Sequence, residues 1–185
     1  MENDNEKEFL TKYYELINEH HGEINYNDYG AYIFSLFFLR YIYCKFQELY
    51  LEIVEDGCGL EEDIDVYVSE DIIYVPPEAR WDYIVENYFS NENKMNIVYA
   101  MKSTEYSNET LKGITKELKF LPANKLKDRN ILSIIHLIDD EKTNYDIFWF
   151  KILKRIFIDI VEIEKSTKFV FLNKIMCDLE YILLN

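Results

Sequence analysis

The side chains that most often bind metals or attack substrates are few in this sequence, and their spacing does not favour such chemistry. His20 and His21 could form a metal pair, but adjacent residues of a helix point in different directions and no carboxylate–histidine spacing accompanies them. A solvated helix end is the favoured interpretation. His136 stands among isoleucines and a leucine and is expected in the core or at its boundary. No serine or cysteine has a context typical of a nucleophile, so the residues predict no catalytic, cofactor-binding or metal-binding site.

The cysteines and the apolar segments indicate the cellular compartment of the protein. Cys44, Cys58 and Cys177 are odd in number and widely spaced, and no Cys-x-x-Cys pair is present, which is typical of reduced thiols in a cytoplasmic protein. The N-terminus is acidic, unlike a secretory signal. The most apolar stretch, residues 31–44, contains polar residues and is shorter than the roughly 20 residues of a membrane span. We therefore expect a cytoplasmic protein that does not contact a membrane.

A strongly acidic stretch covers residues 48–71, with ten acidic residues and no basic one. It contains the loop signal Asp56-Gly57-Cys58-Gly59. The spacing does not fit the twelve-residue calcium loop, and Gly-x-Gly alone is too weak to indicate a phosphate cradle. The favoured interpretation is a solvated acidic loop flanked by helix ends.

The charge balance limits any role on nucleic acid to a local patch. The chain carries 20 basic and 35 acidic residues, a net charge of −15 at pH 7, so on average it repels phosphate backbones. The balance is reversed only in residues 94–129, where eight basic residues stand against four acidic ones. Lys112, Lys116 and Lys119 would share one face of a helix there. They could contact DNA phosphates within an assembled complex or simply keep the surface soluble, and the sequence favours neither.

Composition and periodicity predict a mainly α fold: a single helical bundle of about seven helices, with at most a minor β element near Ile72 and Val75. Only 5 glycines and 3 prolines are present, too few for a turn-rich β fold. A helix from Asn27 or Asp28 to about Glu55 is apolar almost all round, so it is expected at the centre of the bundle.

Three features of these helices, namely Arg40, the pair Arg80 and Trp81, and the helix over residues 148–163, each allow two interpretations. Arg40 interrupts the central helix and is expected to extend its guanidinium to the surface rather than to pair with a buried carboxylate. Arg80 and Trp81 could stack on a nucleotide. The favoured alternative is that Trp81 anchors a short helix while Arg80 pairs with an acidic neighbour. The helix over residues 148–163 is apolar on nearly all sides, which favours a protein interface over a last core helix.

Three segments, in order, resemble the signatures of one family. Residues 28–41 resemble the first signature of the N-terminal domain of type I restriction–modification modification subunits, and residues 75–81 resemble the second. Ala100-Met101, Asn108 and Leu111-Lys112-Gly113 resemble the third. The match divides the chain into an N-terminal-like helical domain (1–140) and a diverged or truncated C-terminal helical segment (141–185). The candidate partner-contact residues in these motifs are Phe38, Leu39, Arg40, Val75, Pro76, Ala79, Arg80, Trp81, Leu111, Lys112 and Gly113.

The resemblance implies a function that the composition does not show. The parent subunit is an adenine-specific DNA methyltransferase that uses S-adenosylmethionine, and its N-terminal domain helps it pair with the specificity subunit and close around DNA. The following catalytic domain needs a Gly-rich turn for the cofactor and an Asn-Pro-Pro-aromatic loop for the flipped adenine. This sequence has neither, since none of Pro76, Pro77 and Pro122 follows an asparagine. We therefore expect no methyl transfer by this chain alone, and a catalytic domain supplied by a full-length modification subunit or a separate chain.

The resemblance to the family is lost near Asp146. Trp149 stands where the family would have glycine. One hypothesis is a truncated or split modification subunit that acts as an assembly module. The alternative is a free-standing acidic decoy that binds the specificity subunit unproductively, or imitates a phosphate backbone with the carboxylates of residues 48–71, and so inhibits or regulates restriction.

Overall fold

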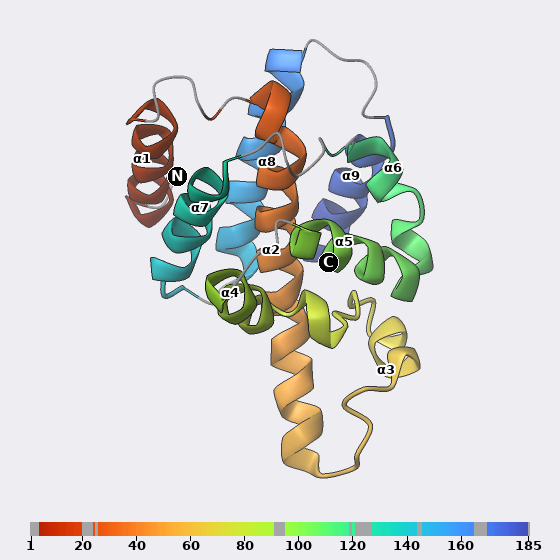
Figure 1. The fold of residues 1–185 in the computed structure, drawn as a ribbon. Coiled ribbons are helices and arrows are strands. Elements are labelled where there is room, and N and C mark those ends of the chain that lie inside the picture. Colours follow the sequence, from red (N-terminus) through yellow and green to blue (C-terminus); the bar gives the residue numbers. More distant parts are fainter. Residues whose placement is uncertain are drawn as a thin grey trace.

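The computed structural model describes residues 4–19, 24, 26–90, 95–118, 120, 127–143, 146–164 and 170–184, and within them the chain is helical (Figure 1). This confirms the mainly α prediction. The described part has nine α-helices rather than about seven, because short helices also form at Ile64–Ser69, in the stretch expected to be a loop, and at Ile114–Leu118. The elements are α1 (Asp4–Glu19), α2 (Tyr26–Asp56), α3 (Ile64–Ser69), η1 (Pro77–Ala79), α4 (Trp81–Ser90), α5 (Met95–Ser107), η2 (Glu109–Leu111), α6 (Ile114–Leu118), α7 (Asp128–Asp140), α8 (Asp146–Glu164) and α9 (Val170–Leu184), where η marks a 3-10 helix.

Helix α2 lies at the centre of the bundle, as its apolar pattern predicts. It runs through the middle of Figure 1 and contacts α4, α5, α7 and α8. Because these neighbours cover it on several sides, side chains that point in different directions are all fully buried. Among them Ile33, Leu36, Phe37 and Phe38 are 0% exposed.

The prediction of a protein interface on the helix over residues 148–163 is wrong. Helix α8 lies along α2, and Trp149, Ile152 and Leu153 have no exposed surface. Its apolar residues fall on nearly all sides because α1 and α2 both cover it, so it is a core helix, and α9 adds Ile175, Met176 and Leu179 to the core after it. Ile147 and Ile158 remain partly exposed.

The β-leaning run at Ile72 and Val75 is extended but forms no strand in the described chain. The Asn108 side chain makes the hydrogen bonds that a neighbouring strand would make. The Tyr74 amide donates to Asn108 Oδ1 (3.0 Å), and Asn108 Nδ2 donates to the Tyr74 carbonyl (2.9 Å). The backbone of this segment is therefore satisfied without a second strand.

The acidic stretch has an exposed loop between helix ends, as predicted, and in addition a short helix, α3. The last turns of α2 extend beyond the other helices at the bottom of Figure 1, and the chain returns through α3. Gly57 (φ 65°) and Gly59 (φ 71°) adopt the left-handed conformation that glycine accepts most easily. Asp63 caps α3 by accepting the Asp65 amide at 3.1 Å.

The expectations for the histidines and cysteines meet different outcomes. His136 is exposed, not core, because the buried face of α7 carries Ile131, Ile134, Ile135 and Ile138 and His136 lies off that face. His20 and His21 lie outside the described residues. All three cysteines are free, as predicted, and burial raises the pKa of the Cys44 thiol to about 11. Among the helices that the structure describes, none combines the length and apolar character that a membrane crossing requires.

Candidate functional site

Arg40 lies inside the fold, so the expectation that it extends to the surface is wrong. Only 6% of it is exposed, and its guanidinium carbon lies 5.8 Å from the ring centroid of Trp81 and 5.1 Å from that of Trp149. Its Nη2 donates to the Thr143 carbonyl at 3.3 Å. The two ring faces and the carbonyl take the place of water around the cation.

The indole N–H of each of these two tryptophans donates a hydrogen bond to a residue outside its own helix. Trp81 Nε1 donates to Asp139 Oδ1 on α7 (3.2 Å), and Trp149 Nε1 donates to the Thr143 carbonyl (3.0 Å). Arg40 on α2 therefore lies where α4, α7 and α8 meet. The favoured interpretation of Trp81 as a structural anchor is confirmed, since it is only 2% exposed.

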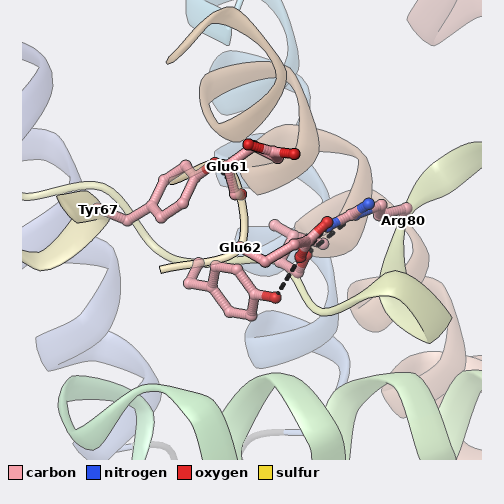
Figure 2. Close-up of polar contacts among 6 residues, drawn as sticks. Glu61, Glu62, Tyr67 and Arg80 are labelled. Carbon is pink, nitrogen blue, oxygen red and sulfur yellow. Dashed lines mark hydrogen bonds and ion pairs between the residues drawn. The ribbon is translucent and has the colours of Figure 1, made fainter. Parts of the chain in front are cut away.

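Arg80 pairs with an acidic residue, as the favoured interpretation predicts, and its partner comes from the acidic stretch. Its Nη2 lies 2.7 Å from both carboxylate oxygens of Glu62, and its Nε donates to the Val75 carbonyl at 3.3 Å. Tyr74 Oη donates to Glu62 Oε2 at 2.7 Å. Figure 2 shows the Arg80 guanidinium directed at the Glu62 carboxylate. We call this group of Glu62, Tyr74 and Arg80 the arginine lock.

The arginine lock rests on a stack of aromatic rings. The Arg80 guanidinium lies 5.1 Å from the centroid of Phe46 and 4.9 Å from that of Tyr50, both on α2. Phe46 in turn stacks on Tyr67 of α3, with 4.9 Å between centroids. Tyr67 is fully buried and its hydroxyl donates to the Glu61 carbonyl (2.7 Å). Because α2 and α3 already occupy these ring faces, the geometry favours a structural joint over a nucleotide-stacking site.

The lock makes the stability of the fold depend on pH. Burial alone would raise the pKa of Glu62, but the hydrogen bonds from Arg80 and Tyr74 and the charge of Arg80 outweigh it, and the pKa falls below its ordinary value of 4.5. The stabilisation is therefore complete above that value and is lost as the pH falls through the lower, folded-state pKa. Because the Glu62 side chain is 48% exposed, Glu62→Gln should lower the free energy of unfolding at neutral pH by only about 0.2–1 kcal/mol.

Urea unfolding over a pH series tests this prediction. The difference between the wild type and Glu62→Gln should vanish in acid, and the neighbouring Glu61→Gln should match the wild type throughout. A difference that stays constant down to low pH would show that the Glu62 charge does not stabilise the lock.

Residues of the third motif are also held inside the fold. The Asn108 amide joins the Tyr74 backbone to the end of α5, where Nδ2 also donates to the Thr104 carbonyl at 2.7 Å. The Glu105 carboxylate accepts the amides of Gly113 (2.6 Å) and Thr115 (3.2 Å). Gly113 has φ 102°, a conformation that strains any residue with a Cβ. The motif thus specifies a turn between η2 and α6.

Most candidate partner-contact residues are therefore unavailable to a partner in this conformation. Arg80 and Gly113 are half-buried and only Lys112 is exposed. The others are buried because they form the core and the joints between helices: Phe38, Leu39, Arg40, Val75, Pro76, Ala79, Trp81 and Leu111. The buried motif residues position the helices, and of the candidate residues only Lys112 and, in part, Arg80 and Gly113 are accessible from outside.

The expected shared face of three lysines is not formed. Lys112 lies before the turn at Gly113 and pairs with Glu109 at 2.8 Å, so it is not on the same helix as Lys116. Lys116 is exposed on α6, and Lys119 lies outside the described residues. The loop signal of Gly113 was the feature that argued against a continuous helix there.

Two adjacent cavities hollow the surface between α3 and α9. One, of about 230 Å3, is lined by Val68, Asp71, Ile72, Ile73, Asn108, Glu109, Thr110, Leu111, Ile175, Asp178 and Leu179. The other, of about 190 Å3, is lined by Tyr41, Ile42, Lys45, Glu70, Asp71, Ile72, Ile73 and Leu179. Both are smaller than the roughly 300–1,000 Å3 of most small-molecule sites. Within the described ranges, no group of three or more histidine, cysteine or acidic side chains is placed to hold a metal ion.

Comparison with known proteins gives a consistent result. The model of the HsdM N-terminal domain family matches residues 2–138. The chain is also 32% identical over 98 residues to the methylase subunit of the type I restriction enzyme MjaIX from Methanocaldococcus jannaschii. That alignment covers 45% of this chain but only 18% of the relative, so the chain spans less than a fifth of that protein. No solved structure matches. Since the family model covers well over half of its length, the chain belongs to the HsdM N-terminal domain family.

Proposed function

We propose that this chain is an assembly module of a cytoplasmic type I restriction–modification system. It binds the specificity subunit and helps the complex close around DNA, while a full-length modification subunit or a separate catalytic chain supplies methyl transfer. The observation that carries the proposal is the family match over residues 2–138, on a helical fold in which most motif residues are buried.

By this proposal the chain neither binds S-adenosylmethionine nor methylates DNA by itself. The matching family model is that of an N-terminal domain, and the sequence has no Asn-Pro-Pro motif to orient an adenine amine. A calorimetric titration of the chain with S-adenosylmethionine should give no binding heat. Measurable affinity would contradict this part of the proposal.

Co-expression with the specificity subunit from the same locus tests the assembly role. We expect a stable complex that survives gel filtration, and no complex with a specificity subunit from an unrelated type I system. Two soluble proteins that do not associate would contradict the assembly role.

The two lysines of this region give a separate test in the cognate complex. If Lys112 and Lys116 both contact phosphates, the double variant Lys112→Ala with Lys116→Ala should bind DNA more weakly, and the slope of log K against log salt concentration should fall by about one unit for each lost contact.

The acidic decoy remains a second candidate because of one specific observation. Residues 48–71 carry ten acidic side chains and no basic one, and most of those carboxylates are exposed. A decoy should lower restriction efficiency in cells that contain the protein in excess over the specificity subunit. Unchanged restriction under that excess would remove this candidate.

A further inference from the structure

We propose that the groove between α3 and α9 binds a basic amphipathic helix of a protein partner. The inference rests on the proposed function, because it names the chemistry of the partner that an assembly module would meet. It concerns residues outside the three motifs, apart from the lining contributed by Asn108 and Leu111 at one end and by Tyr41 at the other.

The groove consists of two adjacent cavities. The cavities of about 230 Å3 and about 190 Å3 share four lining residues, Asp71, Ile72, Ile73 and Leu179. Their far ends lie at η2 and at the Tyr41 side of α2. A short helix laid along residues 71–73 would therefore pass over both cavities.

The floor of the groove is apolar and one wall is exposed. Ile72 and Ile73 are half-buried, Leu179 on α9 faces the same space, and Val68 on α3 is 59% exposed at the edge. Apolar side chains around small cavities favour the insertion of apolar side chains from a partner, which are the usual anchors of a helix in a groove.

The acidic side chains around the groove favour a partner segment of positive charge. Glu70, Asp71 and Asp178 are exposed at its rim. Among the lining residues that the structure describes, the one cation is Lys45, which is already paired with Asp146 at 2.8 Å. This field attracts lysine and arginine side chains and repels phosphate, so it favours a basic protein segment over a nucleic acid.

The groove is already formed in the free chain. Asp71 adopts φ 55°, and the Ile72 amide donates to the Tyr67 carbonyl at 2.9 Å. Asn108 holds Tyr74 just beyond the floor, and Lys154 on α8 pairs with Glu180 on α9. A preformed site reduces the entropy that binding would otherwise cost.

Peptide binding to the full chain tests the inference, with variants matched in size and charge. The probe is a fluorescent synthetic helix with leucines at helical spacing and lysines elsewhere. Val68→Gln, in the groove, is matched by Val54→Gln, another exposed valine at 47%. The triple variant Glu70→Gln, Asp71→Asn and Asp178→Asn is matched by Glu52→Gln, Glu55→Gln and Asp56→Asn at the end of α2. Asparagine at position 71 keeps a residue that tolerates positive φ.

Both groove variants should bind the peptide about tenfold more weakly, which corresponds to about 1.4 kcal/mol, and both controls should bind as the wild type does. Equal losses in groove and control variants would overturn the inference. So would equally tight binding of a lysine–serine peptide of the same charge, or self-association of the chain that Val68→Gln abolishes, which would assign the groove to a second copy.

The outcome is separable from that of the proposed function. If the peptide binds the groove while the specificity subunit does not co-purify, the assembly role fails and the groove assignment stands. If the specificity subunit co-purifies but the peptide does not bind, the groove assignment alone is overturned.

Discussion

Replacing Trp149 by alanine should lower the free energy of unfolding by about 3–5 kcal/mol, the range for removing a large aromatic side chain from a core. Trp149 is fully buried and its ring meets Phe9 at 5.4 Å and Phe148 at 5.1 Å between centroids, both edge to face. The substitution also takes from Arg40 one of the two rings that surround its charge. Since whole domains are stable by only about 5–15 kcal/mol, this is a large fraction of the total.

Urea unfolding followed by far-ultraviolet circular dichroism measures this effect, because fluorescence would change with the loss of one of only two tryptophans. Trp149→Phe should lose less, since it keeps most of the apolar volume but not the indole hydrogen bond. Tyr106→Ala is the control: that side chain is 93% exposed, and its loss should stay within about 0.5 kcal/mol. If Trp149→Ala were as stable as this control, the packing of α8 on α2 would be wrong.

Replacing Asn108 by alanine should cost about 2–6 kcal/mol although it removes very little apolar surface. Asn108 is 5% exposed, and its amide satisfies both the N–H and the C=O of Tyr74. Without it, two backbone groups in a buried segment lose their partner, and each costs about 1–3 kcal/mol. Asn108→Asp should be nearly as damaging at neutral pH, because a carboxylate accepts from the Tyr74 amide but cannot donate to its carbonyl.

The matched control is Thr110→Ala, two residues away and exposed, which should leave the urea midpoint unchanged. Amide hydrogen exchange gives a second measurement, because the Tyr74 amide should lose protection in Asn108→Ala and keep it in Thr110→Ala. Unchanged exchange at Tyr74 would show that Asn108 does not take the place of a neighbouring strand.

The features that could be predicted from the sequence are those with a local pattern. The apolar residues around Phe34 to Leu39 leave no polar face, and that alone places α2 at the centre. The anchoring role of Trp81 follows from its size and from the short helix that it begins. The exposure of His136 was also within reach, because the isoleucines of α7 define one face and His136 lies off it.

The features that could not be predicted depend on residues that meet only in the fold. The environment of Arg40 is made by Trp81 and Trp149, which come from distant helices, so a helix taken alone suggests an extended cation. Glu62 is one of ten acidic residues, and nothing in its neighbours distinguishes it as the partner of Arg80. The pairing of Asn108 with Tyr74 spans 34 residues. The groove likewise combines α3 with α9.

The central position of α2 has a consequence for synthesis of the protein. Helix α2 leaves the ribosome long before α8, which makes the most extensive contact with it. During that interval the most apolar segment of the nascent chain has no main packing partner. Exposed apolar surface of this kind promotes aggregation in the cell. Chaperone demand should therefore fall only once α8 has emerged from the ribosome and packed on α2, and α8 lies beyond residues 2–138, which the family model matches.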